Sequence, residues 1–81
     1  MMKELIINKI ENCRGLIAQF SGNSDNIIRL KGIEKITNKI EKSVNDIDLL
    51  TDINDRESYI KLMIKICDDN IEYMTKFMKR A

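Results

Sequence analysis

Residues 55–80 form a segment whose apolar side chains cover more of a helix circumference than a surface helix needs. At about 100° per residue, these side chains fall into two neighbouring seams. The first seam consists of Ile60, Met63, Ile64, Cys67, Ile71, Met74 and Met78, and the second seam of Tyr59, Leu62, Ile66, Tyr73 and Phe77. Together the seams span roughly 200° of arc, whereas a surface helix usually has an apolar stripe of about 100° or slightly more. The segment is therefore predicted to be a helix that is central in a bundle or covered by a second protein.

Two further helices are predicted before this segment. Apolar residues share one face over 3–20, and Ser21–Ser24 is typical of a helix stop followed by a loop. Residues 25–50 carry a narrow apolar stripe at steps of three and four, which is typical of a helix with a coiled-coil-like contact. Asn54 followed by Glu57 matches the capping-box pattern, which predicts that the third helix starts there. The stripe of 25–50 consists of Ile33, Ile36, Ile40, Val44 and Ile47.

The second and third helices match each other when folded back around Asp52. This places Ile40 opposite Ile64 and Ile33 opposite Ile71, so that apolar residues meet along both helices. We therefore predict one all-α domain over 1–81, with helices at about 3–20, 25–50 and 55–80. The predicted fold is a three-helix antiparallel bundle built on a long hairpin of the second and third helices. The surplus seam predicts self-association as a homodimer, because a twofold lets one patch meet itself.

Composition restricts the compartment and the source. The formal net charge is +1, so the chain has no global electrostatic footprint for nucleic acid. No stretch approaches the roughly 20 apolar residues of a membrane span, and Leu5–Ile7 is too short for a signal segment, which together predict a cytoplasmic protein. Cys13 and Cys67 both occupy apolar helical positions and are predicted to be reduced core thiols. Abundant Ile, Lys and Asn share AT-rich codons, which indicates a bacterial, phage or mobile-element genome.

The residues that most enzymes need are missing from the sequence. It has no His, which removes Ser-His-Asp and Cys-His catalysis and the usual zinc ligands. The three Gly are scattered, so no phosphate-binding loop is present. Asp68, Asp69 and Glu72 share one side of the third helix, with Lys65 and Lys76 three or four positions away. This spacing predicts a solvated face held by ion pairs rather than an acid/base or metal pair. We therefore predict that the protein is not an enzyme and uses no metal or cofactor.

The surplus apolar surface predicts a protein-binding role. The predicted protein is a small inhibitor, regulator or chaperone that occupies a surface of another protein, of unknown identity. Its predicted anchors are the second seam, because aromatic residues commonly dominate such interfaces. Asn70 lies in the middle of the apolar arc. It has two interpretations: a partly exposed polar residue between the seams, or a buried Asn that sets register or oligomeric state.

Two other functions remain open from the sequence. One is a regulator that binds nucleic acid through a basic bundle end, although no aromatic platform or recognition-helix pattern accompanies it. The other is a structural subunit that self-assembles into filaments or rings. The basic residues of the first alternative are Arg29, Lys31, Lys35, Lys76, Lys79 and Arg80.

Overall fold

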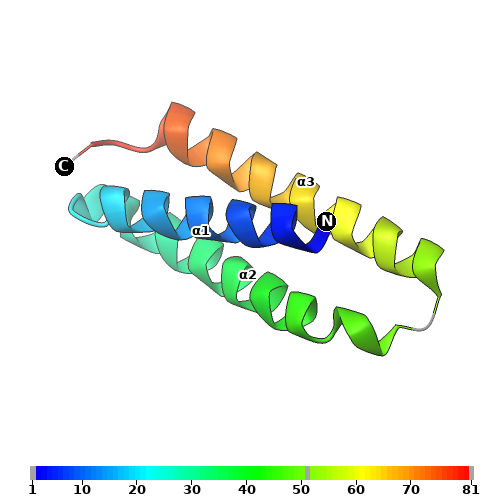
Figure 1. The fold of residues 1–81 in the computed structure, drawn as a ribbon. Coiled ribbons are helices and arrows are strands. Elements are labelled where there is room, and N and C mark those ends of the chain that lie inside the picture. Colours follow the sequence, from blue (N-terminus) through cyan, green and yellow to red (C-terminus); the bar gives the residue numbers. More distant parts are fainter. Residues whose placement is uncertain (1, 51, 81) are drawn as a thin grey trace.

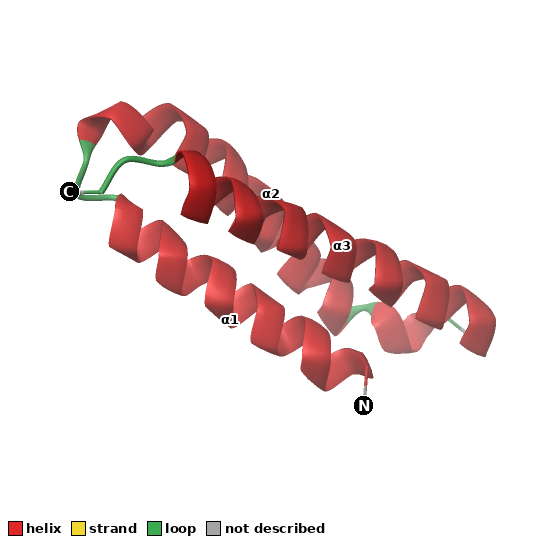
Figure 2. Ribbon diagram, turned by 90° about the horizontal axis from the view of Figure 1, so that it is seen from above, coloured by secondary structure: helices red, strands yellow, loops and turns green. Residues whose placement is uncertain are grey.

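The computed structural model of the chain describes residues 2–50 and 52–80, and nearly all of these lie in helices. The helices lie side by side in an elongated bundle that measures 44 × 18 × 15 Å along its principal axes (Figure 1). In chain order, the elements are α1 (Met2–Phe20), the 3-10 turn η1 (Ser24–Asn26), α2 (Ile27–Asn45), the 3-10 turn η2 (Ile47–Leu49) and α3 (Ile53–Phe77). The described residues contain no strand (Figure 2), and the prediction of an all-helical fold with three packed helices is confirmed.

α1 is the helix that packs against both of the others. Most of the close approaches between helices join α1 to α3 or to α2, whereas α2 and α3 approach each other closely at only a few points. Figure 1 shows α1 in front, with α3 above it and α2 below. In the predicted α2–α3 pairs, Ile33 and Ile40 are buried, but Ile64 and Ile71 are only partly buried. The α2–α3 hairpin is therefore not the main packing unit of the bundle.

The core is a single cluster to which every helix contributes. The first seam supplies all four buried core residues of α3, and its remaining members, Ile64, Ile71 and Met78, pack partly buried against the cluster. The first seam is thus the inner face of α3. The buried core residues are Ile6, Ile10, Cys13 and Phe20 of α1; Leu30, Ile33, Ile40 and Val44 of α2; Ile47 of η2; and Ile60, Met63, Cys67 and Met74 of α3.

The helix ends differ from those that the sequence predicts. The Asp52 carboxylate accepts hydrogen bonds from the backbone N–H groups of Asn54, at 2.8 Å, and Asp55, so α3 begins at Ile53. Asn54 therefore lies inside the helix and is not its cap. α2 covers 27–45 instead of 25–50, because the chain tightens into 3-10 turns on both sides, as often happens at helix ends.

A buried side chain holds the two chain segments at one end of the bundle together. The Asn26 amide nitrogen donates to the carbonyl oxygens of Phe20, at 3.0 Å, and Lys79, at 2.6 Å. Its oxygen accepts a hydrogen bond from the backbone N–H of Lys79 at 3.2 Å. One amide therefore joins the end of α1 to the residues that follow α3, and we call this set of bonds the Asn26 clasp.

Ion pairs at the rim connect α1 to its neighbours. Ion pairs that remain partly open to solvent contribute only about 0–1 kcal/mol each, so these pairs add little to the stability of the bundle. The pairs are Lys3 with Asp48 at 3.0 Å, Lys9 with Asp68 at 2.6 Å, and Arg14 with Glu41 at 2.9 Å.

Candidate protein-interaction surface

The second seam of α3 is half in the core and half in solvent. Tyr59, Leu62 and Phe77 are 43%, 55% and 70% exposed. Ile66 and Tyr73 are partly buried and pack against the core cluster. Their spacing places all five along one side of the helix. The seam is therefore a row of apolar side chains fixed at two points and open to water at three.

An aromatic pair forms the better-ordered half of the second seam. The ring centroids of Tyr73 and Phe77 lie 5.4 Å apart, with the ring planes inclined at 39°. The guanidinium carbon of Arg29, from α2, lies 5.5 Å from the Tyr73 centroid, within the range of a cation–π contact. Aromatic and cation–π contacts each contribute about 0.5–1.5 kcal/mol. The Tyr73 ring is therefore in contact with both Phe77 and Arg29.

A hollow next to Tyr73 is lined in part by Asn70, whose side chain carries an unpaired buried donor. It lies between α2 and α3 and is lined by Arg29, Ile33, Asp69, Asn70 and Tyr73. The Asn70 amide nitrogen is buried and has no hydrogen-bond partner among the described residues. An unpaired buried donor costs about 1–3 kcal/mol. Asn70 as a whole is partly buried, so its position combines features of both sequence interpretations.

α2 adds apolar surface to the same side of the bundle. Ile36 is 40% exposed, although the sequence stripe placed it in the core. It lies seven residues after Arg29 and three after Ile33, and therefore on the side of α2 that approaches Tyr73. The space around Gly32 is open, since a Cβ atom there would meet nothing within 4 Å. The surface between α2 and α3 thus extends the second seam.

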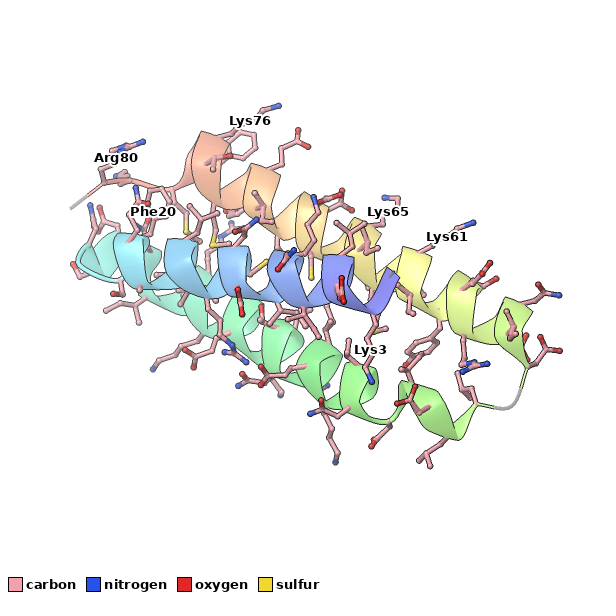
Figure 3. All side chains as sticks on the ribbon, in the orientation of Figure 1. Lys3, Phe20, Lys61, Lys65, Lys76 and Arg80 are labelled. Atoms are coloured by element: carbon pink, nitrogen blue, oxygen red, sulfur yellow. The ribbon has the colours of Figure 1, made fainter. Side chains whose placement is uncertain are left out.

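The six basic residues of the alternative site are all exposed, and several have partners. Arg29 faces the Tyr73 ring, Lys76 pairs with Glu72 at 2.7 Å, and Lys79 pairs with Asp25 at 3.1 Å. Figure 3 shows Lys76 and Arg80 pointing outward near the end of α3. The remaining residues, Lys31 and Lys35, lie exposed on α2. Half of the basic set is therefore already engaged by an aromatic ring or a carboxylate.

The carboxylates of α3 form ion pairs along the helix. Lys65 pairs with Asp69 at 3.1 Å, and Lys76 pairs with Glu72, both at i,i+4 spacing. The predicted solvated ion-pair face is confirmed for Asp69 and Glu72, whereas Asp68 is partly buried and pairs with Lys9 of α1. Within residues 2–50 and 52–80, no group of three or more Cys, Asp or Glu side chains is arranged to hold a metal ion. No helix in this part of the chain has the length and apolarity needed to cross a bilayer.

The structure brings the two cysteines together, which the sequence did not indicate. Both thiols are free and buried, as predicted. The Cys13 thiol donates to the carbonyl oxygen of Cys67, with 3.7 Å between sulfur and oxygen. A second hydrogen bond, between the two thiol groups, lowers the pKa of Cys13 against the opposing effect of burial. The same bond, together with burial, raises the pKa of the Cys67 thiol. Periodicity indicated the face that each thiol occupies, but not its height along the neighbouring helix.

No known protein family, curated protein or solved structure matches this chain.

Proposed function

We propose that this chain is a small protein-binding module that acts as an inhibitor, regulator or chaperone by covering a surface of another protein. In this proposal it is an antiparallel three-helix bundle that self-associates through α3. The observation that carries the proposal is the second seam, in which the exposed Leu62 and Phe77 stand beside the anchored Ile66 and Tyr73. A contiguous exposed apolar patch is typical of an interaction site.

The second seam has the properties of an interface centre. Fully burying one large apolar side chain is worth about 1.5–3 kcal/mol relative to leaving it exposed. Burying Phe77 and Leu62 in an interface would therefore contribute several kcal/mol of binding free energy. Tyr73 is held by contacts with Phe77 and Arg29, so little side-chain entropy is lost when a partner binds.

The order of residues in the second seam supports self-association. Leu62 and Ile66 precede Asn70 along α3, and Tyr73 and Phe77 follow it at similar distances. A twofold axis near Asn70 would set Leu62 against Phe77 of the partner subunit, and Ile66 against Tyr73 of the partner subunit. Asn70 would then lie close to the twofold axis, at the centre of the paired seams. A central Asn of this kind fixes register in helical dimers.

The oligomeric state tests this proposal. We expect the wild type to sediment as a dimer at tens of micromolar and the double variant Leu62→Glu with Phe77→Glu to sediment as a monomer. The matched control is Ile28→Glu with Leu49→Glu, because those side chains are 86% and 78% exposed and lie outside α3. The control should remain a dimer, and all three proteins should keep the same helical circular dichroism. A monomeric wild type, or equal loss of the dimer in both variants, would contradict the proposal.

Salt dependence separates protein binding from the nucleic-acid alternative. Contacts between the basic residues and phosphates would make the affinity for nucleic acid fall steeply with salt concentration. Contacts through the second seam bury apolar surface and should be nearly insensitive to salt. Light scattering that grows continuously with concentration would instead indicate the open-ended assembly of a structural subunit.

A further inference from the structure

Two cysteines are neighbours in the α1–α3 interface. Neither the packing of the core nor the proposed interaction surface requires thiol groups there. Cys13 of α1 and Cys67 of α3 are 0% and 1% exposed. They are 54 positions apart in the sequence, yet the Cys13 sulfur contacts the backbone of Cys67 directly. Small apolar residues would fill the same space. The contact therefore places two reactive groups next to each other, which core packing alone does not require.

The surroundings make the two thiols unequal. A hydrogen bond between the two side chains lowers the pKa of Cys13. Burial and the charge of Asp68 oppose this shift, while the charges of Lys9 and Arg14 add to it. The pKa of Cys67 is raised by this hydrogen bond and by burial. A thiolate, and not a thiol, is the nucleophile in disulfide exchange. Cys13 is therefore the thiol of the pair that ionises more readily.

We propose that Cys13 and Cys67 form a reversible intramolecular disulfide that fastens α1 to α3. The oxidant is a small-molecule disulfide of the glutathione type. The Cys13 thiolate attacks one of its sulfurs, so that a mixed disulfide forms and one small thiolate leaves. Cys67 then loses its proton to solvent base and attacks the Cys13 sulfur, which displaces the second small thiolate. The two protein thiols are oxidised by two electrons, and one disulfide becomes two thiols.

Access to the pair requires a local opening of the bundle. Lys9 lies one turn before Cys13, and Asp68 follows Cys67. Their side chains form the ion pair that spans α1 and α3 beside the thiols. An oxidant can reach sulfur only when these helices separate at that level. Exchange should therefore be slow and limited by opening. The closed disulfide should be favoured because the native fold holds the Cys13 side chain against Cys67.

The equilibrium with glutathione tests the proposal directly. Reduced wild-type protein is incubated with defined ratios of oxidised and reduced glutathione, both in buffer and in denaturing urea. The species are then trapped by alkylation and identified by mass. A cross-link that stabilises the fold must form more readily in the native state. We expect the native equilibrium constant for ring closure to exceed the denatured one roughly 30- to 1,000-fold. The oxidised protein should melt on the order of 10 °C higher, and dithiothreitol should reverse the shift.

Single-cysteine variants provide the controls. Cys13→Ser and Cys67→Ser should each give at most a glutathione adduct, with no rise in melting temperature. Circular dichroism of both reduced variants shows whether they remain folded. A native equilibrium constant equal to or below the denatured one would overturn the proposal. So would oxidation that yields only adducts or cross-linked dimers, or native wild type that stays reduced while the urea-treated chain closes.

Discussion

The two seams of α3 are both apolar, but they differ in burial. Every residue of the first seam is buried or packed against the core, whereas Leu62 and Phe77 of the second seam are mostly in water. The difference arises from the neighbours: most of the close approaches to α3 come from α1, while α2 approaches α3 closely at only a few points. Hydrophobic patterning therefore defines how many faces a helix can bury. The arrangement of the other helices determines which faces are used.

The largest expected effect comes from the first seam. Met74 is fully buried, so Met74→Ala leaves a cavity and should reduce the free energy of unfolding by about 2–5 kcal/mol. Urea denaturation followed by circular dichroism measures the change. Thr75→Ala serves as a neighbouring control, because that side chain is exposed. A loss below about 1 kcal/mol in Met74→Ala would show that the first seam is no better packed than the second.

The Asn26 clasp should have the next largest effect. Asn26→Ala removes three hydrogen bonds and leaves the backbone groups of Phe20 and Lys79 without their partner. We expect a loss of about 1–3 kcal/mol in the free energy of unfolding. Hydrogen exchange would locate the loss. The substitution should increase the amide exchange rate more in the last turn of α3 than in its first turn. An equal increase in exchange rate along all of α3 would show that the Asn26 clasp does not specifically stabilise the C-terminal end of this helix.

The opposite end of α3 should be less sensitive. Asp52→Ala removes the side-chain cap from two backbone N–H groups and should cost about 1 kcal/mol, measured by thermal or urea unfolding. Asp52→Asn should restore most of the loss, since Asn is an equally good cap. An unchanged stability in Asp52→Ala would indicate that the capping-box alternative at Asn54 takes over.

The smallest effect on folding should come from the second seam. Leu62→Ser and Phe77→Ser alter mostly exposed side chains, so each should change the free energy of unfolding by about 0.5 kcal/mol or less at dilutions where the chain is monomeric. The same variants should weaken self-association in sedimentation experiments at higher concentration. A large loss of monomer stability would place these residues in the core, and the contrast between the two seams would disappear.

Periodicity predicted most of the helical structure, and it failed where the chain stops being α-helical. The apolar steps continue through Ile47, which is buried, so the stripe gave no signal that α2 ends at Asn45 and a 3-10 turn follows. The start of α3 was also placed too late, because the sequence indicated Asn54 as the only cap. The capping-box pattern selected Asn54, but Asp52 reaches two N–H groups.

The features that depend on the spacing between helices were harder to predict. The sequence gives no sign that Cys13 and Cys67 meet, because helical periodicity does not specify how one helix slides along another. Ile36 belongs to the α2 stripe but remains 40% exposed, since α2 and α3 pack loosely. The five side chains of the second seam were identified from the wheel alone. Their division into two anchored and three exposed residues required the position of α1.

The central position of α1 has a consequence for the order in which the chain folds. Ribosomes add about 5–20 residues per second, so Cys67 is joined to the chain roughly 3–10 s after Cys13. During that interval α2 is the only other helix that can shield the inner face of α1. Contacts between α1 and α3 close a long loop, so they form only after α3 has been synthesised. A ribosome that pauses within α3 would therefore hold a nascent chain in which part of the apolar face of α1 is exposed. Chaperones would be needed most at this stage.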